Sequence, residues 1–304
     1  MQAPDDFNPT PSVADLLQPG VRRILAPNPS PMTYRGTNTY VVGQTGLAVI
    51  DPGPLSDAHL DAILAAVEPG QRITHVIVTH AHVDHSPLAA ELSQQTGAPV
   101  MGFGPATAGR STVMTQLLDQ GLNSGGEGID TDFMPDIEVA DGETITGEGW
   151  SLEVLHTPGH LGNHIALALE DACFTADHVM GWASSLVSPP DGDLTDFMAS
   201  CRRLRARPWR VFYPGHGAPI EDPSGRLDWL INHRKAREAA ILNALEAGPA
   251  TPGELARQIY TETPPALLMA AERNVLAHLI DLMGKSRVAP ENGLTATTAF
   301  GLLG

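Results

Sequence analysis

The chain has 304 residues, 42% of them hydrophobic, and a formal net charge of −17 at pH 7. Enough apolar side chains are present for a sizeable core, which excludes an intrinsically disordered chain. Only two cysteines occur, so a disulfide framework is excluded and a reducing compartment is favoured. The first eight residues resemble no signal peptide, and no run of about 18 apolar residues occurs. We therefore expect a cytoplasmic globular protein with no membrane partner.

Residues 1–20 are rich in proline, aspartate and serine, and we expect them to form an irregular leader. Residues 21–230 alternate short apolar strands with turns and a helix at Asp57–Val67, which predicts a layered α/β domain. Residues 101–136 show no clear period and are expected to form a long excursion on the side of the functional site. The strands are predicted at Thr39–Val42, Leu47–Ile50, Val76–Thr79, Glu153–Leu155, Ile165–Leu169, Cys173–Thr175 and Val211–Tyr213.

The character of the sequence changes after residue 230, and residues 231–304 are expected to form a separate C-terminal domain with a tail. Thr251 and Glu254 have the spacing of a capping box, and Thr263 is the expected cap of a further helix. Three helices and a short β-ribbon in about 70 residues predict a winged-helix-like unit. The helices are predicted at His233–Glu246, Pro252–Tyr260 and Pro264–Met283, and the ribbon at Ser286–Ala289 and Leu294–Ala299.

A dense group of potential metal ligands follows the apolar strand at residues 76–79. His80 and His82 are two residues apart, so they can point the same way from the end of the strand. Asp84 and His85 are adjacent to each other and can serve a second metal ion. In a core each of these polar groups would be costly without a partner. Imidazole and carboxylate groups without a thiolate suit zinc, manganese or iron.

Three more potential ligands, His160, Asp177 and His216, each lie just past a predicted strand. This is where α/β folds place their functional sites. Two divalent ions about 3.5–4 Å apart can share a water and lower its pKa toward about 7, which gives hydroxide at neutral pH. The sequence therefore predicts a metal-dependent hydrolase.

These motifs resemble the metallo-β-lactamase fold superfamily, which implies an αββα sandwich with a metal-bridging hydroxide as the nucleophile. Asp51, in an Asp-Pro-Gly segment, matches the superfamily's first motif and would orient the ligands. Asp84, Asp177 and His164 are the candidate catalytic residues, His164 because it follows His160 closely. The resemblance implies two ions, with zinc favoured, held by His80, His82 and His160 and by Asp84, His85 and His216, with Asp177 bridging both.

A narrower resemblance is to the β-lactamase-like protein 2 group, whose members carry a C-terminal winged-helix-like domain. It rests on Asn28–Thr33, Gly36–Gly43 and Asp193–Met198, together with residues 234–290. The animal member of that group is an endoribonuclease that acts on single-stranded RNA. The resemblance therefore implies RNA cleavage as an alternative to hydrolysis of a small ester.

The substrate stays open at this point. RNA needs a basic path, and the best stretch is Arg202–Arg210, with five arginines in nine residues. A solvated or internally paired helix face is the simpler interpretation of this stretch, and the acidic chain disfavours DNA. Further alternatives are a glyoxalase-II-like thioesterase and, outside enzymes, a nucleic-acid-binding regulator with a structural metal. A homo-oligomer is compatible with the sequence.

Overall fold

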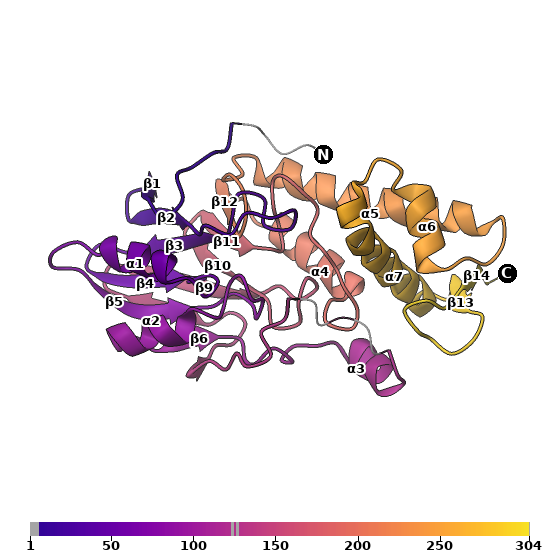
Figure 1. Cartoon of the computed structure of the whole chain (residues 1–304), viewed down its shortest axis with the longest axis horizontal. Coiled ribbons are helices and arrows are strands. Elements are labelled where there is room, and N and C mark those ends of the chain that lie inside the picture. The colour runs from indigo at the N-terminus through magenta and orange to yellow at the C-terminus, as the bar shows by residue number, and fades with distance from the viewer. Residues whose placement is uncertain (1–5, 123–124, 126–127, 304) are drawn as a thin grey trace.

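The computed structural model describes residues 6–122, 125 and 128–303. In this part of the chain two β-sheets lie face to face with helices on both outer faces, so the predicted αββα sandwich is confirmed (Figure 1). The first sheet has seven strands in sequence order. They are β1 (Ala14–Gln18), β2 (Val21–Leu25), β3 (Asn38–Val42), β4 (Gly46–Ile50), β5 (Arg72–Ile77), β6 (Val100–Gly102) and β7 (Ile137–Glu138).

The second sheet has five strands in the order β12-β11-β10-β9-β8. Two pairs of neighbours, β4–β5 in the first sheet and β11–β12 in the second, run parallel. The carboxyl ends of parallel strands meet at one edge of a sheet, so the loops after these strands can converge. The strands are β8 (Thr144–Gly147), β9 (Trp150–His156), β10 (Ile165–Leu169), β11 (Ala172–Ala176) and β12 (Val211–Pro214).

The core between the sheets is built from alternate residues of the facing strands. Tyr40 and Ile50 of the first sheet pack with Leu152, Leu167 and Phe174 of the second. The other side chains of these strands point to the outer faces, because successive residues of a strand alternate between its two sides. Both faces of each sheet are therefore covered, which explains why β3, β4 and β11 are buried along their whole length.

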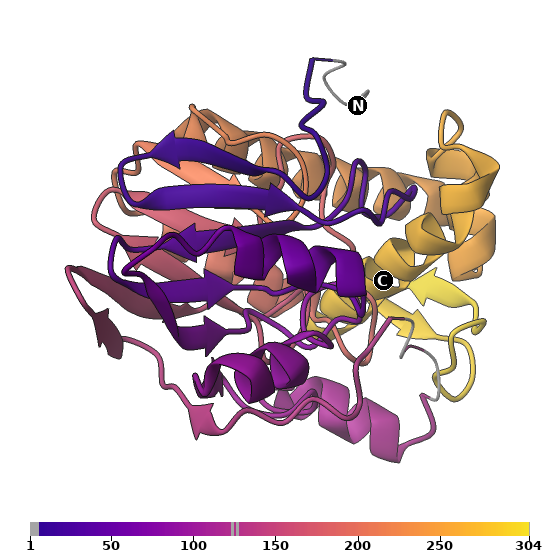
Figure 2. The same cartoon turned by 60° about the vertical axis from the view of Figure 1, so that its left-hand side comes forward.

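Helices close the sandwich on both sides. Figure 2 shows α1 (Asp57–Ala65) and α2 (Ala89–Thr96) in front of the first sheet, where Leu60 and Leu92 join its outer core. On the other side, α4 (Leu194–Arg205) and α5 (Pro223–Leu245) cover the second sheet through Phe197 and Leu230. No helix in the described ranges combines the length and apolar character needed to cross a bilayer.

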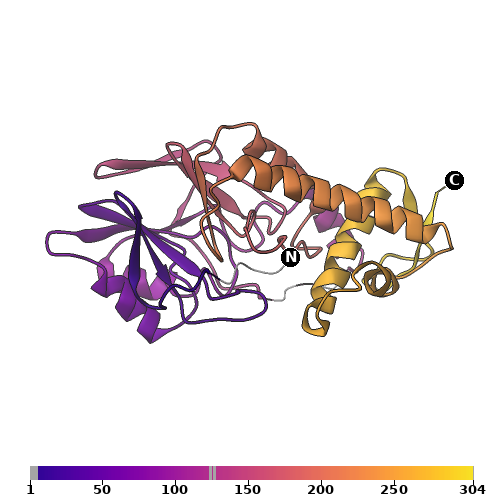
Figure 3. The same cartoon turned by 90° about the horizontal axis from the view of Figure 1, so that it is seen from above.

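The C-terminal unit contains α6 (Pro252–Ile259), a 3-10 turn at Pro265–Leu267, α7 (Leu268–Gly284) and the antiparallel strands β13 (Val288–Pro290) and β14 (Phe300–Leu302). The predicted capping box is confirmed, since Thr251 and Glu254 bond reciprocally at the start of α6. The 23-residue helix α5 runs from beside the second sheet to this unit, across the boundary predicted at residues 230 and 231 (Figure 3).

Several local predictions were wrong. The second strand of the ribbon is Phe300–Leu302 and not Leu294–Ala299, and the helix predicted to begin at His233 begins at Pro223. The leader contains the strand β1, which is half-exposed and pairs with β2 at the edge of the sheet. The excursion contains α3 (Thr112–Asp119), whose Met114 and Leu117 pack into the core of the C-terminal helices. Thr263 caps no helix, because two prolines after it form the 3-10 turn and α7 begins without a side-chain cap.

Candidate metal centre

The first sheet supplies the ligands that follow β4 and β5. Asp51 comes directly after β4, with a φ of 50°, and its N–H donates to the carbonyl of Ile77 at the end of β5. This bond fixes the two strand ends side by side. The chain then continues through Thr79 into His80, so that the predicted histidine motif begins next to the carboxylate of Asp51.

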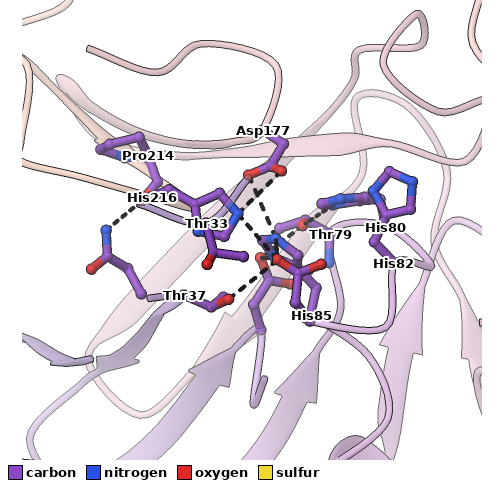
Figure 4. A network of polar contacts seen from close by, with 12 residues as sticks. Thr33, Thr37, Thr79, His80, His82, His85, Asp177, Pro214 and His216 are labelled. Carbon is purple, nitrogen blue, oxygen red and sulfur yellow. Dashed lines mark hydrogen bonds and ion pairs between the residues drawn. The ribbon is translucent and has the colours of Figure 1, made fainter. Parts of the chain in front are cut away.

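The second sheet supplies the remaining side chains from its facing edge. His160 follows β9, Asp177 follows β11 and His216 follows β12. Figure 4 shows Asp177 reaching from this side toward His85 and His216. The structure thus brings all seven predicted ligands together, although 136 positions of the sequence separate the first from the last.

Two groups of ligand atoms can be distinguished, and Asp177 touches both. In the first group, the ligand atoms of His80, His82, His160 and Asp177 all lie within 4.8 Å of one another. His82 Nδ1 lies 3.0 Å from His160 Nε2, and His160 Nε2 lies 3.7 Å from Asp177 Oδ2. A His/Asp cluster with this geometry is a candidate metal site.

The second group consists of Asp84, His85 and His216, which also meet the 4.8 Å limit. His216 Nε2 lies 3.1 Å from Asp84 Oδ2, and His85 Nε2 lies 3.5 Å from the same oxygen. Asp177 reaches this group as well, with Oδ1 3.5 Å from His85 Nε2 and Oδ2 3.3 Å from His216 Nε2. The carboxylate of Asp177 therefore stands between the two groups.

Asp51 orients one histidine of each group. Its Oδ1 accepts the N–H of Thr79 at 2.7 Å, and its Oδ2 accepts the Thr79 hydroxyl at 2.8 Å and His85 Nδ1 at 2.9 Å. Since the Thr79 hydroxyl donates to Asp51, Thr79 Oγ1 accepts from His80 Nδ1 at 2.9 Å. Both imidazoles consequently turn their Nε2 atoms toward the cluster, as second-sphere partners of metal-binding histidines do.

Backbone carbonyls orient two further histidines. His160 Nδ1 donates to the carbonyl of Leu186 at 2.7 Å, and His216 Nδ1 donates to the carbonyl of Gly36 at 3.1 Å. Their Nε2 atoms are thereby directed into the cluster. The predicted orienting residue Asp51 lies where the sequence placed it, whereas Thr79 and Leu186 were missed.

Several atoms that point into the cluster lack a hydrogen-bond partner within the described residues. They are His80 Nε2, His85 Nε2 and Asp177 Oδ1, all buried. A buried polar atom without a partner costs about 1–3 kcal/mol. Divalent cations take imidazole nitrogen and carboxylate oxygen as ligands, so the donor set fits metal ions.

The electrostatics of the cluster indicate where positive charge belongs. Burial alone lowers the pKa of His85, but the carboxylates of Asp84, Asp177 and Asp51 raise it well above its usual range. For His216, burial is likewise outweighed by Asp177 and Asp84, which raise its pKa to about 10. These protons balance the buried carboxylates in the metal-free protein. Metal binding displaces such protons and takes over their charge.

Comparison with known proteins agrees with this geometry. Residues 32–216 match the family model of the metallo-beta-lactamase superfamily, which covers more than half of the chain. The chain belongs to the metallo-beta-lactamase superfamily. Residues 251–293 match the beta-lactamase associated winged helix domain, so the winged-helix-like prediction for the C-terminal unit is confirmed.

Relatives within the superfamily include beta-lactamase-like protein 2 homologs and proteins named as thioesterases. A beta-lactamase-like protein 2 homolog from Drosophila melanogaster is 33% identical over 294 residues, covering 90% of this chain and 91% of the relative. An atrochrysone carboxyl ACP thioesterase from Aspergillus fumigatus is 28% identical, covering 89% of this chain and 82% of the relative. A metallo-beta-lactamase family protein from Thermus thermophilus has 26% identity and a TM-score of 0.75, covering 95% of this chain and 100% of its own.

The predicted catalytic residue His164 packs against His80 of the cluster. It is fully buried, its Nδ1 lies 2.9 Å from Thr157 Oγ1, and its ring centroid is 5.0 Å from that of His80. Burial holds its pKa well below the usual range, so the ring is neutral. This position supports the packing of His80, and the catalytic role predicted for His164 stays a prediction.

The loop between β11 and α4 carries Leu186, and two arginines of α5 hold it. Arg226 donates to the carbonyls of Met180 and Ala183, both at 2.6 Å. Arg234, which is buried, donates to the carbonyl of Ser185. No pattern in the sequence indicates these contacts, because their partners are backbone atoms more than 40 positions away.

The arginine run at residues 202–210 is largely paired with acidic side chains. Its ion pairs span 2.7–3.1 Å and leave little charge for a phosphate backbone. The simpler interpretation of this stretch, an internally paired face, agrees with the structure. The pairs are Arg203–Asp141, Arg205–Asp228, Arg207–Glu153 and Arg210–Asp171.

Proposed function

We propose that this protein is a dinuclear metal-dependent hydrolase of ester-type bonds. The observation that carries the proposal is the arrangement of two ligand groups around one shared carboxylate, Asp177. In the proposed assignment, His80, His82 and His160 hold one ion, and Asp84, His85 and His216 hold the other. When bound, such a pair of ions polarises the scissile bond and lowers the pKa of a water to about 7.

The residues of the chain have separate roles in this proposal. Asp51 and Thr79 fix the ring orientations of His80 and His85, so that the site is organised before substrate arrives. Asp84 has 21% of its side chain exposed, against 9% for Asp177, so it faces the open side of the cluster. Its Oδ2 accepts the Thr37 hydroxyl at 3.3 Å, which helps to hold this carboxylate in place as a candidate metal ligand.

Two observations favour a carboxylic ester or thioester over single-stranded RNA as the substrate. A relative at 28% identity is named as an acyl-carrier thioesterase, which supports a carboxylic ester or thioester. The pairing of the arginine run weakens the case for single-stranded RNA, which needs unpaired cations along its path. RNA cleavage therefore remains the second candidate. The free, buried state of Cys173 and Cys201 supports the proposed cytoplasmic location.

One experiment tests the proposal and separates it from a regulator with a structural metal. Bound zinc and manganese are counted per chain, and hydrolysis of p-nitrophenyl acetate, an S-acetyl thioester and a fluorogenic single-stranded RNA is measured. About two labile ions and ester hydrolysis that Asp177→Ala abolishes are expected. Asp61→Ala, which removes an exposed carboxylate on the outer helix α1, is the control and should keep the activity. A single tight ion without hydrolysis would support the regulator instead.

A further inference from the structure

A groove with a volume of ≈ 420 Å³ lies between the catalytic domain and the C-terminal helices. One wall is the loop after β11, a second belongs to α5 and the end of α6, and a third is the start of α7, while Met32 lies at the remaining side. Met32 is 46% exposed, a large apolar surface left uncovered beside other apolar groups. The apolar and aromatic lining includes Met32, Met180, Trp182, Leu186, Trp229 and Tyr260.

The groove adjoins the candidate metal centre through two of its own lining residues. Leu186 lines the groove, and its carbonyl accepts the Nδ1 proton of His160. Trp182 lies against Gly217, where an added Cβ would stand 2.8 Å from Trp182 Cδ1, and Gly217 directly follows His216. A substrate with its reacting bond at the cluster can therefore extend along this groove.

The walls of the groove are fixed before a ligand binds. The two carbonyl bonds from Arg226 hold the loop at Met180 and Ala183, and Arg226 also lies over the ring of Trp229, 4.2 Å from its centroid. The same arginine thus joins the loop wall to the helical wall. A preformed apolar groove loses little conformational entropy on binding, which favours affinity for an apolar group.

The charges along the groove favour an uncharged occupant. Arg237 lies over the ring of Tyr260, 4.4 Å from its centroid, and donates to a backbone carbonyl at the end of α6. His233 stacks on Trp229, and burial together with nearby arginines lowers its pKa to about 4, so it is neutral at pH 7. Glu262 adds an acid to the lining. A phosphate backbone would meet no row of available cations among the described residues that line this groove.

We propose that this groove binds the apolar acyl chain of the ester or thioester substrate, and that Trp182 and Trp229 determine the preference for chain length. The inference rests on the proposed hydrolase and adds the substrate class. The acyl carbonyl would lie at the cluster, and the chain would pass Leu186 and Trp182 toward Trp229 and Tyr260. The C-terminal domain then acts as part of the specificity site.

The kinetic test uses a series of p-nitrophenyl esters from acetyl to decanoyl with the metal-loaded protein. Each buried methylene should raise kcat/KM by about two- to fourfold until the groove is filled. Trp229→Ala should flatten this series by removing an apolar wall of the groove. Leu16→Ala removes an apolar side chain that is 71% exposed on β1, and as the matched control it should keep the full slope.

The binding test needs no metal and no turnover. In metal-free protein, 11-bromoundecanoic acid should quench tryptophan fluorescence with saturation, because the bromine would lie beside Trp182 or Trp229. Trp182→Phe and Trp229→Phe should each remove part of the quenching, while acetate should give none. Circular dichroism melting of each variant shows that it remains folded.

The outcomes of these two tests distinguish failure of the acyl-groove proposal from failure of the proposed hydrolase. Acetyl hydrolysis without chain-length dependence and without quenching would overturn the acyl groove and leave the hydrolase intact. Quenching without hydrolysis of any ester would refute the hydrolase and with it the substrate assignment. Quenching by oligouridylate that competes with the bromo acid would overturn the proposal in favour of bases stacked on the two tryptophans.

Discussion

Asp51 offers the sharpest test of how the cluster is organised, because Asp51→Asn keeps the shape of the side chain while it removes the charge and replaces one acceptor by a donor. Both carboxylate oxygens accept hydrogen bonds: Oδ1 from the Thr79 N–H, and Oδ2 from the Thr79 hydroxyl and His85 Nδ1. An amide NH₂ in place of Oδ1 would face the backbone N–H, which cannot turn away. The amide is therefore expected to place its NH₂ at the Oδ2 position.

That orientation changes the tautomer of His85. An NH₂ group at Oδ2 donates to His85 Nδ1, so the proton of the neutral ring moves to Nε2, the atom that faces Asp84 and Asp177. A protonated Nε2 cannot bind a metal ion. Loss of such an orienting partner lowers metal affinity by about 10–100-fold, which is about 1.4–2.8 kcal/mol.

The assay is competition for zinc with a chromophoric chelator, together with urea unfolding of the metal-free variants. Asp51→Asn should lower the affinity for zinc by about 10–100-fold. The loss should be at least as large as for Asp51→Ala, in which neither tautomer of His85 is favoured by a hydrogen bond from residue 51. Asp61→Asn, at an exposed position of the outer helix α1, should bind as the parent does. An Asp51→Asn variant that keeps its affinity within twofold while folded would refute the role given to Asp51.

Three further predictions concern the surroundings of the cluster. Arg234→Met removes the donor to the Ser185 carbonyl inside the core and should lower the free energy of unfolding in urea by about 2–4 kcal/mol, whereas unchanged stability would contradict this contact. Burial lowers the pKa of His59 to about 4. The free energy of unfolding should therefore fall by up to about 3 kcal/mol as the pH drops from about 6.5 to 4, and His59→Gln should flatten that pH dependence. Gly159 has a φ of 134°, and Gly159→Ala would place a Cβ 2.3 Å from backbone atoms of Phe197. The variant should therefore show a large fall in melting temperature, which Gly70→Ala, at a position with open space around it, should not show.

The metal ligands were predictable because the signal is local and chemical. His80–His85 holds four potential ligands in six residues after an apolar strand, and Asp177 and His216 also follow strands closely. Parallel pairing of β4 with β5 and of β11 with β12 then brings the strand ends to one edge. The spacing of these residues does not determine how the two sheets face each other. Their convergence on one site was therefore predictable only from the family resemblance.

The wrong predictions concern elements whose signals are weak or distant. β1 is a half-exposed edge strand with Leu16 facing solvent, so its sequence lacks the apolar alternation of a buried strand. α3 did carry a signal in Ser111, whose side chain caps the helix by accepting the N–H of Met114. Its amphipathic face was overlooked because its packing partners are in the C-terminal helices, more than 120 positions later.

The contacts of the loop after β11 couple the catalytic domain to helices α5 and α7. Residues 183–189 are largely shielded from water, and their carbonyls need donors that the loop itself does not supply. Arg234 and Arg273 provide them, to Ser185 and Pro189, while Asn274 accepts the N–H of Val187. The Leu186 carbonyl thereby remains at its place and accepts from His160. Because α5 and α7 carry all three of these side chains, the geometry of the metal centre depends on the C-terminal helices.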